Sequence, residues 1–142
     1  MKKFLLLTLT CIILFGACTP RVEMPADPRD SIMKLLTGTG NKRWFLRKSY
    51  LNNVQQTLTD YQLKYWKDYT INPAQPYMGV WADENGWEGK WRMPNTQEIP
   101  ETVTNNTAAV IKNYVINSIT ATELDIEYTA NLVTTREVYH AN

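Results

Sequence analysis

The fold is decided by residues 77–93, which read YMGVWADENGWEGKWRM. From position 87 to position 93 the apolar residues and Gly89 fall on every second position with charged residues between them, which is typical of a strand with one buried face. A similar stretch, 77–82, precedes the tetrapeptide Asp83-Glu84-Asn85-Gly86. Because Asn-Gly supplies the positive φ angles of a tight turn, the segment predicts an antiparallel hairpin.

Alternation of the same kind recurs along the rest of the chain. It predicts eight strands, which cover residues 43–50, 63–71, 77–82, 87–93, 97–103, 108–119, 123–129 and 133–140. In the first strand Trp44, Leu46 and Tyr50 share one side. The connections are too short for crossover helices, so neighbouring strands are antiparallel. Eight such strands close into a barrel just wide enough to be filled by side chains or to hold one small ligand.

A short helix precedes these strands. Its apolar face is formed by Ile32, Leu35 and Leu36. Asp30 or Ser31 can cap its start, and Gly38 or Gly40 can end it. We therefore predict an all-β fold over residues 30–142, an eight-stranded antiparallel up-and-down barrel preceded by a short helix. The 142 residues leave no room for a second domain.

The first residues have the charge, length and order of an export signal. Lys2 and Lys3 precede an apolar run over residues 4–15, and the small residues Gly16 and Ala17 follow. The run is shorter than the roughly 20 residues of a spanning helix, so residues 1–17 are predicted to be a cleaved signal peptide. Residues 14–18, LFGAC, resemble the bacterial lipobox. That resemblance implies that Cys18 becomes an acylated first residue, carrying a diacylglyceryl group and further fatty acid such as palmitate, and several acyl chains make a durable membrane anchor.

The predicted anchor determines where the domain is held. Residues 18–29 contain three prolines and are interpreted as an extended tether. Thr19 replaces the aspartate that retains some lipoproteins in the inner membrane, which favours the outer membrane of the cell envelope. A single acid within residues 19–23 favours its periplasmic face over the cell surface. Cleavage removes two lysines and changes the formal net charge from +1 to −1, and this balance argues against nucleic acid as a partner.

The pattern resembles the lipocalin-like lipoproteins of Bacteroidetes and, more distantly, the lipocalin and fatty-acid-binding barrels. The resemblance covers residues 31–142 and rests on Leu35-Leu36-Thr37-Gly38, Trp44 after Lys42, the hairpin at 83–86, Gly89-Lys90-Trp91, and a meander from Tyr114-Val115-Ile116 to Leu124-Asp125-Ile126. It implies a barrel that binds a small ligand. Lipocalins place an arginine of a late strand over the first-strand tryptophan, so the resemblance implies that Arg136 lies over Trp44. The alternative is an arginine at an edge that faces solvent.

The chain offers few groups for catalysis. Cys11 leaves with the signal peptide, the Cys18 sulfur is acylated, and His140, the single histidine, lies near the C-terminus, where chains fray. The hairpin acids could form a carboxylate pair or a cation site, but the needs of a turn explain them more simply: Asp83, Glu84 and Glu88. We therefore expect no enzyme, no catalytic residue, no metal and no cofactor.

The inward-facing positions are unusually aromatic. The candidate ligand-binding residues are Trp44, Tyr65, Tyr69, Trp81, Trp91, Tyr114 and Tyr128. They suit a pocket for a small apolar ligand, and they equally suit a barrel filled by its own side chains. Gly79 and Gly89 either open space beside the tryptophans or relieve strand curvature.

Two functions are consistent with these features of the sequence. The first is a membrane-anchored carrier of a small apolar ligand held in the barrel. The second is a protein- or glycan-interaction module, in which the barrel is only a scaffold and outward groups such as Trp66, Trp87 and the hairpin at Asp83 engage the partner.

Overall fold

The computed structural model of the chain describes residues 25–103 and 111–142. The predicted signal peptide at 1–17, the lipidation of Cys18 and the first part of the predicted tether at 18–29 lie outside the described residues. Within the described ranges the chain forms α2 (Arg29–Thr37), β1 (Asn41–Leu51), β2 (Val54–Gln56), the 3-10 helix η2 (Gln62–Lys64), β3 (Trp66–Ile71), β4 (Met78–Asp83), β5 (Glu88–Arg92), β6 (Glu98–Val103), β7 (Ile111–Ile119), β8 (Glu123–Ala130) and β9 (Val133–His140).

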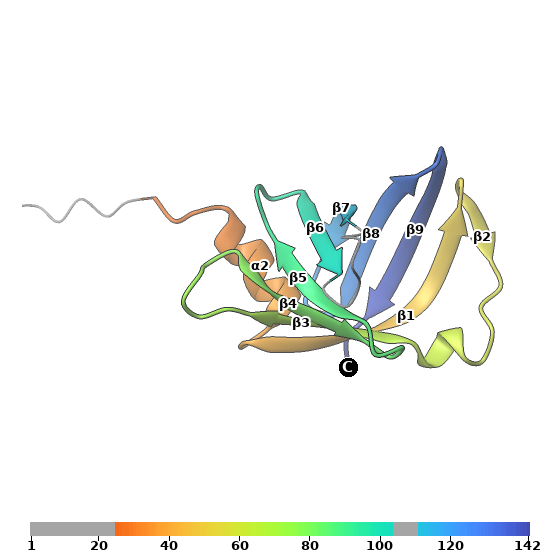
Figure 1. Ribbon diagram of the computed structural model, residues 1–142, viewed down its shortest axis with the longest axis horizontal. Helices are drawn as coiled ribbons and strands as arrows, with labels where there is room; N and C mark the ends of the chain where they lie inside the picture. The colour runs from red at the N-terminus through yellow and green to blue at the C-terminus, as the bar shows by residue number, and fades with distance from the viewer. Residues whose placement is uncertain (1–24, 104–110) are drawn as a thin grey trace, which may run out of the picture.

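The strands form one antiparallel sheet that closes on itself (Figure 1). From β3 to β9 each strand pairs with the next along the chain, β1 pairs with β3, and β9 pairs back onto β1 between Phe45↔His140 and Leu51↔Thr135. Eight antiparallel strands therefore close into an up-and-down barrel, and the predicted fold class is confirmed.

The alternation does not predict β2, which pairs with the last residues of β1. Asn52 and Asn53 make the connecting turn with φ angles of 46° and 68°, a conformation that asparagine tolerates. β2 has only three residues, too few to show a period of two. The predicted strand at 63–71 also starts later than expected, because residues 62–64 form η2.

A bulge in β1 changes which side chains face the interior. The pairing of β1 with β9 shifts between Leu46 and Lys48, so Arg47 is an extra residue in the ladder. One extra residue reverses the in and out positions that follow it. Tyr50 was expected on the side of Trp44 and Leu46, and this expectation is wrong. Tyr50 instead faces outward beneath Arg136, with the guanidinium carbon 5.0 Å from the ring centroid.

One end of the barrel is closed by α2 (Figure 1). Leu36 of the helix is fully buried, and its carbonyl accepts a 2.9 Å hydrogen bond from Nε1 of Trp44, which is also fully buried. The predicted N-cap at Asp30 or Ser31 is wrong, because the helix begins at Arg29, whose backbone N–H donates to the Asp27 carboxylate. Gly38 ends the helix with a φ of 60°, as predicted.

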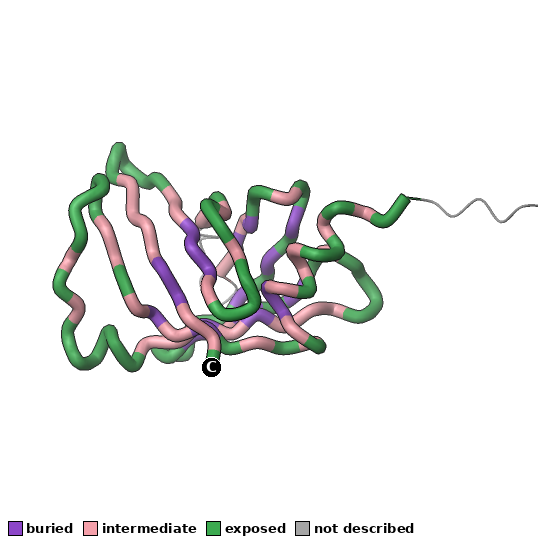
Figure 2. The backbone as a smooth tube through the Cα atoms, turned by 180° about the vertical axis from the view of Figure 1, so that it is seen from behind, coloured by how far each residue is buried: buried purple, intermediate pink, exposed green. Residues whose placement is uncertain are grey.

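The core lies between the strands and extends to α2 (Figure 2). Two tryptophans each lie over the glycine that faces them on the neighbouring strand, because Gly79 pairs with Trp91 and Gly89 pairs with Trp81. A Cβ on Gly79 would lie 1.9 Å from the Thr70 carbonyl oxygen and 2.6 Å from Trp91 Nε1. The glycines therefore open no free space, since neighbouring indole rings occupy it.

The β4–β5 turn differs in detail from the prediction. Gly86 has a φ of 77°, and Asn85 does not have a positive φ. The Asp83 carbonyl accepts from the Gly86 N–H at 3.1 Å, and the Asp83 N–H donates to the Trp87 carbonyl at 2.9 Å. These bonds are those of a three-residue loop that ends in a left-handed glycine. The predicted hairpin is confirmed, with one positive φ angle in place of two.

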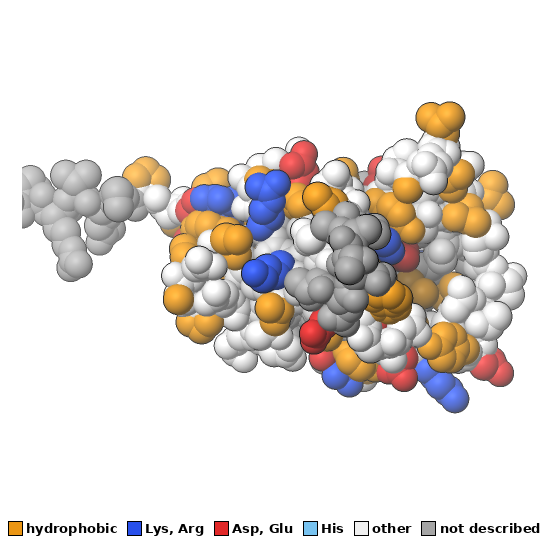
Figure 3. Space-filling model, viewed as in Figure 1, with side chains coloured by type: hydrophobic (Ala, Val, Ile, Leu, Met, Phe, Trp, Pro, Cys, Tyr) orange, Lys and Arg blue, Asp and Glu red, His pale blue; other side chains and the backbone are white. Residues whose placement is uncertain are grey.

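The β1–β2 and β8–β9 hairpins project at the end of the barrel away from α2 (Figure 1). Their tips are joined by hydrogen bonds between Asn52 and Thr134, in both directions, at 2.9 and 3.0 Å. Leu132 is 96% exposed and has a φ of 64°. Hydrophobic side chains gather at these tips (Figure 3), namely Leu51, Val54, Leu132 and Val133.

Candidate binding site

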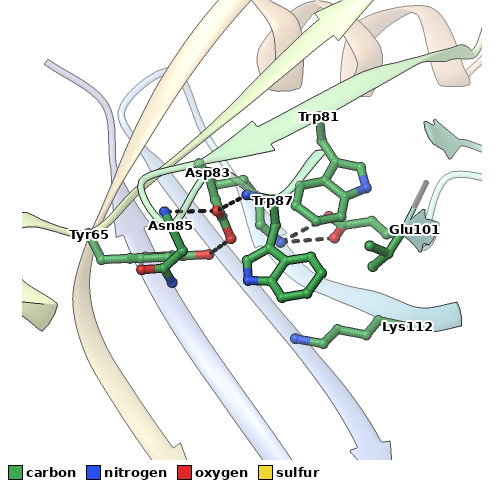
Figure 4. Close-up of a pocket in the computed structure, with 9 residues that line it drawn as sticks. Tyr65, Trp81, Asp83, Asn85, Trp87, Glu101 and Lys112 are labelled. Atoms are coloured by element: carbon green, nitrogen blue, oxygen red, sulfur yellow. Dashed lines mark hydrogen bonds and ion pairs between the residues drawn. The ribbon is translucent and has the colours of Figure 1, made fainter. Parts of the chain in front are cut away.

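A hollow of about 320 Å³ lies at the end of the barrel opposite α2 (Figure 4). It is lined by residues of β4, β6 and β7, by the start of β3 and by the β4–β5 turn. We call it the first hollow. Its volume is at the lower end of the range of small-molecule pockets. The barrel interior between it and α2 is packed with aromatic and aliphatic side chains.

The inner wall of the first hollow contains a buried ion pair. Nζ of Lys67 lies 2.9 Å from Oε2 of Glu101, and the two side chains are only 4% and 2% exposed. Tyr69 also donates its hydroxyl to Glu101. Because each charge is neutralised where water is excluded, the wall is polar but carries no net charge.

Asp83 occupies the point where the turn meets the hollow. Its Oδ1 accepts the backbone N–H groups of Asn85 and Trp87 at 2.9 and 3.0 Å, which confirms the predicted turn role. Its Oδ2 accepts the Tyr65 hydroxyl at 2.9 Å. Burial and the negative charge of Asp83 raise the pKa of Tyr65 above its ordinary value, so this phenol stays a proton donor.

The apolar walls of the first hollow come from Trp81, Trp87 and Val103. Trp87 was predicted to face outward; it lines the hollow with part of its ring and keeps 42% of its surface exposed. Trp81 is nearly buried, and its Nε1, which lies against Gly89, has no hydrogen-bond partner within the described ranges. An aromatic wall that is partly open to solvent suits the apolar body of a small ligand.

Lys112 brings a second cation to the first hollow. Its Nζ lies 4.7 Å from the centroid of the Tyr128 ring. Among residues 25–103 and 111–142, no carboxylate lies within 4.0 Å of it, in contrast to Lys67. Its charge is therefore available to an anionic group of a ligand.

The structure separates the seven predicted ligand-binding residues. Tyr65 and Trp81 line the first hollow. Four others are buried in the core: Trp44, Tyr69, Trp91 and Tyr114. Tyr128 packs edge-on against Tyr114, with ring centroids 5.1 Å apart. The inward orientation of all seven is confirmed, and ligand contact by any of them stays a prediction.

Several lining residues were not among the sequence candidates. They are Lys67, Asn85, Glu101, Val103 and Lys112. Alternation does place Lys67 on the inward side with Tyr65 and Tyr69, and it places Glu101 and Val103 there with Ile99. The period of two was therefore a sufficient signal for these three, although the charge of Lys67 and Glu101 argued against an interior position.

The expected contact of Arg136 with Trp44 is wrong. On β9 the side chain of Glu137 reaches interior tyrosines, so its neighbour Arg136 faces the outside. There Arg136 pairs with Asp125 at 2.5 Å. The cation over the Trp44 ring is Lys42, at 4.0 Å from the centroid, and its Nζ donates to the carbonyls of Leu35 and Ala121.

Other groups considered in the sequence lie away from the first hollow. His140 Nε2 is 3.1 Å from a Glu123 carboxylate oxygen, and both side chains are more than two-fifths exposed. Trp66 stacks under the Arg43 guanidinium at 3.8 Å. In the part of the chain that the structure describes, no cluster of three His, Cys, Asp or Glu is arranged to hold a metal ion. That part also contains no helix with the length and hydrophobicity needed to span a bilayer.

Comparison of the chain with protein-family models, with curated proteins and with solved structures found no match.

Proposed function

We propose that the protein is a lipid-anchored carrier of the cell envelope, which binds a small, mainly apolar ligand at the open end of its barrel. The observation that carries the proposal is the first hollow, a space of about 320 Å³ walled by Trp81, Trp87 and Val103. Burial of an apolar ligand surface against such walls contributes about 25 cal/mol per Å² before the costs of association. Lys112 would meet an anionic end of the ligand.

The ligand site is tested with a fluorescent anionic dye, anilinonaphthalene sulfonate, titrated into the purified domain. We expect saturable binding that Trp87→Ala weakens at least about tenfold, because the variant removes one aromatic wall. Trp66→Ala is the matched control, since Trp66 lies over Arg43 outside the hollow. Equal dye affinity of the wild type and Trp87→Ala would contradict the assignment.

The anionic end of the ligand is tested in the same assay. Lys112→Met keeps the length and apolar character of the side chain and removes its charge, and we expect about tenfold weaker dye binding. Lys48→Met, at an exposed position of β1, is the control. A loss of affinity in both variants would indicate a general effect of net charge, and no loss in either would remove Lys112 from the site.

The natural ligand is sought by native mass spectrometry of protein purified from its own host. A co-purified small molecule that is lost from Trp87→Ala supports the carrier. A second candidate, the protein- or glycan-interaction module, is favoured by the exposure of Tyr61 and Trp87, which is 59% and 42%. Glycan binding without dye binding would support that candidate.

The anchor is tested in cells. Labelling with radioactive palmitate is expected for the wild type and is expected to disappear in Cys18→Ala. Protease treatment of intact cells separates the two faces of the outer membrane, and protection of the domain is expected for the periplasmic face. Labelling of Cys18→Ala equal to that of the wild type would contradict the lipid anchor.

A further inference from the structure

A second hollow of about 560 Å³ lies beside the first. The two share Tyr65 and Asn85 in their linings. The remaining lining of the second includes Leu46, Tyr61 and Glu137, and none of the described residues that line it is a lysine or arginine. The proposed carrier function does not use this space.

Glu137 is held in an unusual way. It is half-buried on β9, and its Oε2 accepts the Tyr139 hydroxyl at 2.8 Å and the Tyr114 hydroxyl at 3.4 Å. Within residues 25–103 and 111–142, no lysine, arginine or histidine nitrogen lies within 4.0 Å of it. Lys67 reaches it only through the Tyr114 hydroxyl, 3.5 Å from Nζ.

The other interior carboxylates are balanced differently. Glu101 has Lys67 as an ion-pair partner. Asp83 is bound by two backbone N–H groups and one phenol. Glu137 has only two neutral phenols, and neutral donors do not cancel its charge. Burial and the charge of Glu137 raise the pKa of both Tyr114 and Tyr139, so these hydroxyls remain protonated donors.

The surroundings of Glu137 select the kind of cation that would balance it. Tyr61 and Tyr65 line the same hollow with Leu46, and aromatic rings beside a carboxylate favour an organic cation. A hard metal ion would need several oxygen ligands, and no cluster of three metal-ligating side chains exists among the described residues. We propose that the second hollow binds an organic ammonium cation, with Glu137 as its counter-ion and Tyr61 and Tyr65 as its aromatic walls.

The test compares three probes of similar shape, butylammonium, butanol and butanoate, followed by NMR titration of the labelled domain. We expect butylammonium to bind at least about tenfold more tightly than the other two, because it alone carries a positive charge that can balance the Glu137 carboxylate. The largest shifts should fall on Tyr61, Tyr65 and Glu137. Equal affinity for butylammonium and butanol would overturn the proposal.

Glu137→Gln keeps the shape of the side chain and removes its charge. We expect at least a tenfold loss of butylammonium affinity, while the control Glu127→Gln, on the outer face of β8, leaves it unchanged. Should Glu137→Gln fail to fold, Tyr61→Ala replaces it, because Tyr61 is 59% exposed and its removal is tolerated by the core. Unchanged butylammonium binding in a folded Glu137→Gln, or in Tyr61→Ala where that variant is used, would also overturn the proposal.

The proposals for the two hollows can be contradicted independently. Trp87→Ala is expected to weaken binding of the dye and to leave binding of butylammonium unchanged. Glu137→Gln is expected to weaken binding of butylammonium and to leave binding of the dye unchanged. A protein that binds the dye but not butylammonium retains the carrier site and loses this second one.

Discussion

The two ends of the barrel are built from the same strands and differ in what fills them. At the end closed by α2 the interior is apolar, with Leu36, Trp44, Trp91, Met93 and Leu124 all essentially buried. At the open end the same alternation places two lysines, three carboxylates and several tyrosines around two hollows. Buried ionic groups contribute little to stability compared with well-packed apolar ones. We therefore expect the closed end to supply most of the stability, and the composition of the open end is consistent with the binding function proposed above.

The largest effect is expected at the closed end. Trp91→Ala removes a buried indole whose Nε1 donates to the carbonyls of Thr70 and Val80 at 3.1 Å. We expect the free energy of unfolding to fall by about 4 kcal/mol, as for large buried aromatics elsewhere. Trp87→Ala, at the open end, should cost less than about 1 kcal/mol. Urea denaturation measures both, and equal losses would abolish the proposed division between the two ends.

The second-largest loss of stability is expected when the buried ion pair of the open end is broken. Lys67→Met leaves the Glu101 carboxylate buried beside Tyr69 without its cation, and we expect a loss of about 3 kcal/mol. The double variant Lys67→Met with Glu101→Gln should recover most of that loss, because no unpaired charge remains. A double variant as unstable as the single one would mean that the pair itself stabilises the fold, as apolar packing does at the closed end.

The tyrosines should make the open end sensitive to alkali. The pKa values of Tyr65, Tyr69, Tyr114 and Tyr139 are raised, mainly by burial, above the value near 10 of an unfolded chain. A raised pKa means that the neutral phenol is favoured by folding, so this stability is complete below pH 10 and is lost as the pH rises further.

Each of these groups adds about 1.4 kcal/mol of destabilisation per pH unit in that range. Above pH 10 the free energy of unfolding should therefore fall less steeply with pH for Tyr139→Phe than for the wild type. Tyr50→Phe, on the outer face, is the control. Identical pH dependence in all three proteins would contradict the burial of Tyr139.

The smallest effect lies at the hairpin tip beyond the open end. Leu132 has a φ of 64°, which costs a residue with a Cβ about 1–2 kcal/mol, and its 96% exposed side chain gains little in return. Glycine removes that strain but increases the entropy of the unfolded chain, so Leu132→Gly should stabilise the protein by about 0.5 kcal/mol. Leu132→Ala keeps the Cβ and should bring no gain. Thermal melting distinguishes the two.

The sequence predicts the barrel well because the signals are local and repeated. Alternation from Trp87 to Met93 and short turns such as 83–86 determine the strands and their antiparallel order. The register of that hairpin also places the Gly-x-Trp of each strand against the Gly-x-Trp of the other, an arrangement that neither strand predicts on its own. Alternation does not predict where a bulge interrupts it. The bulge at Arg47 therefore places Tyr50 on the opposite side from the one expected.

The site was less predictable because a hollow is what remains after packing. Seven aromatic residues faced inward as expected, but composition cannot tell which of them meet another ring and which meet empty space. Lys67 and Glu101 have the period of inward residues, but a lone charge inside a barrel is unfavourable. Each is stable there because of the other, 34 residues away in the chain.

The pairing of β1 with β9 has a consequence for how the chain folds. The first and last strands of the barrel meet along Phe45↔His140 to Leu51↔Thr135, so the wall cannot be completed before the C-terminal residues are available. Contacts at such large sequence separation form slowly, because the entropy of a long loop must be overcome first. A nascent chain that has not yet emerged as far as β9 therefore has an open sheet with two unpaired edges. Were the chain exported as proposed, this delay would favour an extended polypeptide until β9 has crossed the membrane.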